Sequence, residues 1–248
     1  LRESMSKDQF VNEVLDGLLD PPKYFPSNVS INKEGYVESE DVLNKNLNAF
    51  KPSEVEKLIN KDVTILDVRS ADEFAKSHIP GSIFIGLDGR FAPWVGEILE
   101  DVSIKLLLIV PMDREKEAIL RLSRVGFDNV HGYLEGGIQN WIESGKEISS
   151  VENESAYNFS KHNSKQTKNI LDVRSKSEHS SESLEKSLNI PLPELSYSID
   201  EVSFTDRFYI HCKGGYRSMI AASLLLSKGV SNIVNIAGGF DEIKRFQS

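Results

Sequence analysis

The chain has 248 residues, of which 39% are hydrophobic and 27% are charged, and it holds one cysteine. These values are typical of a soluble globular protein with room for one large or two modest domains. The single cysteine excludes internal disulfides and cysteine-rich zinc sites, and the net charge of −9 disfavours nucleic acid or an anionic membrane as a main partner. No apolar run reaches the length of about 18 residues that a membrane span needs, and we expect a cytoplasmic protein in a reducing compartment.

Residues 1–45 do not resemble the rest of the chain. The stretch 5–20 has the amphipathic pattern of a helix, with Ser6 and Gln9 placed as a capping box, and the proline-rich stretch 21–35 predicts an extended arm. Segments of this size cannot form a core alone, so we expect them to dock on the repeats or to belong to another domain. The chain begins with Leu rather than Met, and we expect it to be part of a longer protein.

Residues 46–146 alternate between short apolar strands and helices. Strands are predicted at 62–68, 82–87 and 104–110, and a helix that follows the last of them ends at Gly126. This alternation predicts an α/β domain, with a central parallel sheet flanked by helices. The polar residues 144–155 are predicted to form a linker.

Residues 156–248 repeat the same pattern. The hexapeptide Ile-Leu-Asp-Val-Arg-Ser at 65–70 occurs again at 170–175, and the double glycine at 136–137 occurs again at 238–239. The chain is therefore predicted to contain two copies of one domain.

The cysteine lies where the strongest strand of the second copy ends. Cys212 is followed by Lys213, Gly214, Gly215, Tyr216, Arg217 and Ser218, which lead into a helix predicted to begin near Arg217 or Ser218. Ligand sites in parallel sheets lie beyond the carboxyl ends of strands, and paired glycines and a helix N-terminus supply N–H groups to an anion. A lone cysteine is usually a buried small hydrophobe, but this setting favours ionisation of the thiol and predicts a reactive Cys212.

Several of these motifs together resemble rhodanese domains. They are the repeated Leu-Asp-Val-Arg-Ser, the His-Ile-Pro-Gly-Ser at 78–82, the Cys-x-x-Gly-x-Arg loop at 212–217 and the terminal Gly-Gly, and the resemblance covers about residues 46–248 as a tandem pair. It implies a sulfurtransferase that moves sulfane sulfur between thiosulfate or a low-molecular-weight persulfide and a thiol or cyanide, through a persulfide on Cys212. Arg217 would assist catalysis, and the substrate would be bound by Lys213, Gly214, Gly215, Tyr216 and Ser218. The Cys-x4-Arg spacing is one residue shorter than the Cys-x5-Arg of the related tyrosine phosphatases, which favours sulfur transfer.

The first copy departs from this pattern. Pro111 is predicted to stand where the cysteine would lie, in a loop about two residues shorter that carries Asp113, Glu115 and Glu117. We expect residues 46–146 to be an inactive domain with a structural role. The second copy departs as well, because Ser183 and Lys186 replace the His and Gly of the His-Ile-Pro-Gly turn.

The aspartate and arginine of each Leu-Asp-Val-Arg-Ser segment are expected to be mainly structural, since both copies have them. The pairs Arg69–Glu73 and Arg174–Glu178 have the i,i+4 spacing of ion pairs at helix starts. Strand alternation predicts that His211 points away from Cys212.

The N-terminal stretch is similar to the C-terminal tail of metallo-β-lactamase-fold persulfide dioxygenases. This resemblance implies a fused dioxygenase domain that holds non-haem iron, whereas the present chain needs no cofactor or metal. The partners so implied are a thiosulfate or persulfide donor and a small thiol acceptor; the sequence leaves a homodimer open. The alternative function is a non-catalytic or slowly reacting rhodanese scaffold in a larger sulfide-oxidising protein.

Overall fold

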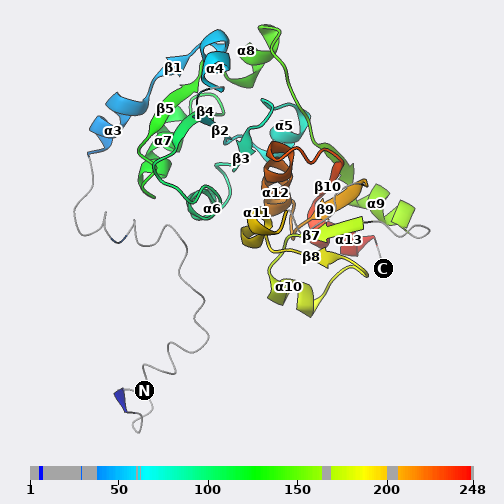
Figure 1. The fold of residues 1–248 in the computed structure, drawn as a ribbon. Helices are drawn as coiled ribbons and strands as arrows, with labels where there is room; N and C mark the ends of the chain where they lie inside the picture. The colour runs from blue at the N-terminus through cyan, green and yellow to red at the C-terminus, as the bar shows by residue number, and fades with distance from the viewer. Residues whose placement is uncertain are drawn as a thin grey trace.

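The computed structural model describes residues 6–7, 29, 38–59, 61, 63–163, 169–199 and 206–246. The helix and arm predicted for residues 5–35 lie almost entirely outside the described residues. The described chain forms two α/β units, one after the other (Figure 1).

The first domain is built around a five-stranded parallel sheet with the order β1-β5-β4-β2-β3. Its elements are β1 (Ala49–Phe50), α4 (Pro52–Ile59), β2 (Val63–Asp67), α5 (Ala71–Lys76), β3 (Ile83–Phe84), α6 (Phe91–Ile98), β4 (Lys105–Ile109), α7 (Glu115–Ser123), β5 (Val130–Leu134) and α8 (Gly137–Glu143).

The second domain repeats this topology, with the strand order β6-β10-β9-β7-β8. Its elements are β6 (Glu152–Ser155), α9 (Ala156–Asn163), β7 (Asn169–Asp172), α10 (Lys176–Ser181), β8 (Leu188–Asn189), the 3-10 helix η1 (Leu192–Glu194), α11 (Leu195–Ser198), β9 (Phe208–His211), α12 (Tyr216–Ser227), β10 (Ile233–Ala237) and α13 (Gly239–Arg245). The predicted α/β class, with two parallel sheets flanked by helices, is confirmed.

Both domains begin earlier than the predicted starts at residues 46 and 156. Helix α3 (Ser39–Asn46) packs on α7 and β5, so chain before residue 46 already belongs to the first domain. The predicted linker 144–155 is not a free linker. Its residues 152–155 form β6, which pairs with β10 in the second sheet, and Val151 is buried and donates its N–H to the carbonyl of Ala75.

The repeated Asp-x-Arg has the same structural role in both domains. Arg69 forms a buried ion pair with Asp67 and donates to the carbonyl of Ser77, the residue that ends α5. Arg174 does the same with Asp172 and the carbonyl of Glu182 at the end of α10. The predicted i,i+4 pairs are therefore wrong, because each arginine reaches back to the aspartate two residues earlier.

The two domains pack through α12. This helix lies against β3 and α5 of the first domain, at the junction seen in Figure 1. The hydroxyl of Ser223 on α12 accepts a hydrogen bond from the N–H of Phe84 on β3, over 3.0 Å. Apolar side chains from both domains form one continuous core around this contact, so the edge strand β3 is covered by the second domain.

Candidate functional site

Cys212 directly follows β9, and its side chain is 1% exposed. The loop 213–215 then turns into α12, which begins at Tyr216, slightly earlier than predicted. Gly215 adopts a left-handed φ of 96°, a conformation that residues with a Cβ rarely adopt. That turn directs the N–H of Gly215 at the sulfur of Cys212, with a distance of 3.1 Å from N to Sγ. The loop thus presents one backbone donor to negative charge on the sulfur.

The terminal Gly-Gly explains how the loop is held. Gly239 begins α13, and a Cβ there would come within 2.5 Å of the Cys212 carbonyl oxygen. The close approach lets Phe240 donate its N–H to the Cys212 carbonyl over 2.7 Å, and Asp241 donates to the Lys213 carbonyl over 3.1 Å. The first turn of α13 therefore fixes the backbone carbonyls of Cys212 and of Lys213 after it.

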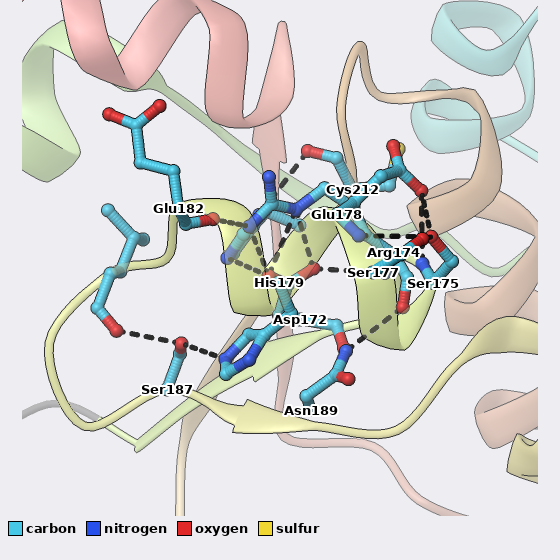
Figure 2. A network of polar contacts seen from close by, with 12 residues as sticks. Asp172, Arg174, Ser175, Ser177, Glu178, His179, Glu182, Ser187, Asn189 and Cys212 are labelled. Atoms are coloured by element: carbon cyan, nitrogen blue, oxygen red, sulfur yellow. Dashed lines mark hydrogen bonds and ion pairs between the residues drawn. The ribbon is translucent and has the colours of Figure 1, made fainter.

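A buried polar cluster of Asp172, Arg174 and His211 lies at the end of β9. Arg174, ion-paired with Asp172, stacks over the ring of Phe240 at 3.9 Å. His211 is fully buried, with its Nε2 3.9 Å from the Asp172 carboxylate, and burial lowers the pKa of this imidazole. Figure 2 shows how the Asp172–Arg174 pair joins the polar network of α10 near Cys212. These groups hold the strand and helix ends and are not among the residues that line the pocket beside the thiol.

Arg217 is bound to a carboxylate. Its guanidinium donates two hydrogen bonds to Glu178, at 2.6 and 2.7 Å. Hydrogen bonding from Arg217 lowers the pKa of Glu178 to about 2, so the carboxylate is ionised near neutral pH. Glu178 also closes a capping box with Ser175 at the start of α10. Arg217, which was predicted to assist catalysis, is therefore already paired within the protein.

A pocket of about 480 Å³ opens over the thiol. The second domain contributes four of the loop residues and one from α10, and the first domain contributes the rest; together they are Cys212, Gly214, Tyr216, Arg217, Glu178, Gly89, Arg90 and Trp94. Three predicted site residues lie outside this lining, namely Lys213, Gly215 and Ser218. Lys213 is exposed, and Ser218 is buried with its hydroxyl donating to the carbonyl of Gly215.

Tyr216 joins the loop to the first domain. Its hydroxyl donates to the Gly86 carbonyl over 2.7 Å, and its ring meets that of Phe84 edge-on, with centroids 5.9 Å apart. Burial raises the pKa of the Tyr216 phenol, which keeps its proton for this bond. A Cβ on Gly89 would stand 2.4 Å from the Tyr216 ring, so the first domain needs glycine there to admit the tyrosine.

Sequence reasoning missed the four lining residues Glu178, Gly89, Arg90 and Trp94. Glu178 was assigned to the wrong arginine. The other three belong to the first domain, and their only signal was the run Gly89-Arg90 directly before an aromatic helix start.

The first domain has no thiol at the corresponding place. Strand pairing matches Asp67 with Ile109 and Asp172 with His211, so Val110 is the equivalent of Cys212. The prediction that Pro111 occupies this position is wrong by one residue. The following helices end with matching hydrogen bonds, from the N–H of Phe127 to the Leu122 carbonyl and from the N–H of Val230 to the Leu225 carbonyl. Loop and helix together are therefore one residue shorter in the first domain, whereas the loop itself, 111–114, is not shorter than 213–215, contrary to the prediction.

Within the described ranges, no group of three or more His, Cys, Asp or Glu side chains is arranged to hold a metal ion. No helix among the same residues is long and apolar enough to cross a bilayer.

Known proteins resemble this chain in parts. A curated relative from Bacillus subtilis, named "Putative sulfur carrier protein YrkF", is 34% identical over 71 residues, which are 29% of this chain and 38% of that protein. One from Schizosaccharomyces pombe, named "Putative thiosulfate sulfurtransferase, mitochondrial", is 28% identical over 111 residues, 39% of this chain and 78% of that one. The solved thiosulfate sulfurtransferase of Pseudomonas aeruginosa is 19% identical, with 78% of this chain and 41% of that chain covered and a TM-score of 0.37.

The chain thus spans well under half the length of the first of these relatives. The family model of the Rhodanese-like domain matches it twice, at residues 51–144 and 155–246. These two matches correspond to the two parallel sheets and leave out little of the described chain. The chain belongs to the rhodanese-like family and carries two such domains in tandem.

Proposed function

We propose that this chain is a sulfurtransferase that carries sulfane sulfur on Cys212. The observation that carries the proposal is the Cys212 sulfur itself, which receives the Gly215 N–H and lines a pocket at the carboxyl end of a parallel sheet. The names of the two relatives described above, which concern sulfur carriage and thiosulfate sulfur transfer, support it.

The proposed cycle has two displacements. The Cys212 thiolate attacks the outer sulfur of thiosulfate, or the terminal sulfur of a low-molecular-weight persulfide, and the S–S bond of the donor breaks. Sulfite, or the donor thiolate, leaves with the bonding electron pair, and Cys212 becomes a persulfide. A second thiolate, or cyanide, then attacks the terminal sulfur, and Cys212 departs as the thiolate. The N–H of Gly215 stabilises the sulfur anion at the beginning and end of the cycle.

The wider setting is part of the proposal. We infer that the chain works in a reducing compartment such as the cytoplasm, because the cycle needs Cys212 as a free thiol. The similarity of residues 5–35 to the tail of persulfide dioxygenases supports a fused iron-containing domain whose chemistry would produce sulfite from persulfides.

The test is the Cys212→Ser variant. Incubation of the wild type with thiosulfate should add one sulfur atom, about 32 Da, to the intact mass, and a thiol should remove it. Cys212→Ser should show no adduct and no turnover, because a serine hydroxyl cannot form a persulfide. Circular dichroism should show that the variant is folded. Turnover above a few per cent of the wild type in folded Cys212→Ser would refute the assignment of the sulfur carrier.

A further inference from the structure

We propose that the first domain selects the organic thiol that exchanges sulfur with Cys212, through Arg90 and Trp94, and that this thiol carries a carboxylate. The inference rests on the proposed function. It gives the domain without a thiol a direct role in substrate recognition.

The charges in the pocket point to Arg90. The guanidinium of Arg217 is held by two hydrogen bonds to Glu178, so these two charges largely compensate one another. Lys213 is exposed and does not line the pocket. Arg90 lines it, and within the part of the chain that the structure describes its side chain makes no hydrogen bond or ion pair. Apart from Cys212 itself, the lining residues therefore carry a net positive charge, and it comes from the first domain.

The size and surface of the pocket point to an organic ligand. Its volume of about 480 Å³ lies in the range of roughly 300–1,000 Å³ that small-molecule sites usually have. The half-buried ring of Trp94 supplies an apolar wall against which a carbon skeleton can pack. Inorganic thiosulfate uses neither the volume nor the indole.

The arrangement of the three groups assigns one pose. The sulfur of the ligand meets Cys212, its carbon skeleton lies along Trp94, and its carboxylate pairs with the planar guanidinium of Arg90, which can hold both oxygens. A thiol with a carboxylate satisfies the cation, the apolar wall and the nucleophile together. Recognition is then divided between the domains: the second reacts with the sulfur and the first binds the remainder of the molecule.

Arg90 can be substituted with little risk to the fold, because its side chain makes no hydrogen bond or ion pair within the described chain. Arg90 precedes α6 but makes no side-chain capping bond. Arg90→Gln should therefore fold as the wild type does. Arg124→Gln is the matched control, because Arg124 is an exposed arginine of the same domain and is not a pocket residue.

The experiment loads Cys212 with sulfur from thiosulfate, removes the excess, and follows the loss of the persulfide by intact mass. The two acceptors are N-acetylcysteine and its amide, which differ by one carboxylate. Arg90→Gln should slow N-acetylcysteine by about tenfold or more and its amide by less than about twofold, because only the acid loses an ion pair. Trp94→Ala should slow both acceptors to a similar degree, and Arg124→Gln neither.

A second measurement does not depend on sulfur transfer. S-methyl-N-acetylcysteine, which cannot react, is titrated into Cys212→Ser protein while tryptophan fluorescence reports on Trp94; Trp141, the other tryptophan, is buried elsewhere in the first domain. The Kd of S-methyl-N-acetylcysteine should rise about tenfold when Arg90→Gln is added to Cys212→Ser. The amide of this ligand should bind weakly to Cys212→Ser both with and without Arg90→Gln.

The outcomes separate the two proposals. Failure of the wild type to take up sulfur would defeat the proposed function, while the titration would still test recognition. Normal uptake with equal effects of Arg90→Gln on the acid and the amide would overturn this inference and leave the sulfurtransferase standing.

Discussion

Glu178 has two roles that meet at a single side chain. It closes the capping box with Ser175 at the start of α10, and it holds Arg217, which lines the same pocket as Cys212. Removal of Arg217 would leave an unpaired carboxylate in the pocket. The effect of an Arg217 substitution therefore has two candidate causes, the loss of a cation and the exposure of an anion.

A double-mutant cycle separates these causes. Arg217→Ala alone should slow persulfide formation from thiosulfate by roughly tenfold or more, because the exposed Glu178 charge repels the dianion. In a Glu178→Gln background the same Arg217→Ala change should cost much less. The measurement is the rate of sulfur uptake by Cys212 in the four proteins. An equal cost in both backgrounds would show that Arg217 binds the donor directly.

At the scale of the secondary-structure elements, α10 depends on the ionisation of Glu178. Its pKa in the folded protein is about 2, below the ordinary value of 4.5, so the ionised form stabilises the fold. That stabilisation is fully present above about pH 4.5 and is lost as the pH falls toward 2.

The wild type should therefore be more stable to urea than Glu178→Gln by a constant margin from pH 8 to about pH 5, and the margin should shrink by pH 3. Urea midpoints at pH 7 and pH 3 measure it. Glu185→Gln serves as the control, because Glu185 is exposed and lies outside the capping box. A margin that is the same at both pH values would contradict the role given to the Glu178 charge.

The strands and helix starts around the repeated segments were predictable from the sequence because their signals are local, whereas β6 lies in the predicted linker. Buried parallel strands form short apolar runs, and the repeated Leu-Asp-Val-Arg-Ser marked the same β-strand and helix start twice. The position of Cys212 at the end of β9 followed from the same pattern. The equivalence of Val110 with Cys212 was missed, because it depends on the pairing of β2 with β4, which local sequence does not specify.

The contribution of the first domain to the pocket could not be predicted at all. Gly89, Arg90 and Trp94 reach Cys212 only because α12 packs on β3, and that packing depends on side chains more than a hundred residues apart in the chain. Likewise, the ion pair between Arg217 and Glu178 forms only because α10 lies beside the start of α12. Interactions of this kind leave no periodic pattern in one sequence.

At the scale of the whole molecule, the loop that follows Cys212 is held by both domains. Tyr216→Phe removes the hydroxyl that donates to the Gly86 carbonyl and leaves that acceptor without its partner, which should cost about 1–2 kcal/mol of stability. Sulfur uptake should also slow several-fold, because Tyr216 is attached to the turn that carries Gly215.

Thermal unfolding and the rate of sulfur uptake measure these two effects. Tyr157→Phe is the matched control, since among the described residues the one hydrogen bond of the Tyr157 hydroxyl is accepted from Lys161 on its own helix. If Tyr216→Phe loses stability but takes up sulfur at the wild-type rate, then the first domain supports the fold without positioning the loop.

The connection between the domains is itself short and tied down. Ser149 pairs with His78 of the first domain, Val151 donates to Ala75, and the next residue already begins β6 of the second sheet. Because this connection is short and bound to the first domain, each domain is held at a very high effective concentration relative to the other. A modest interface is then enough to keep the pocket assembled, and its two walls can diverge in sequence without the risk of coming apart.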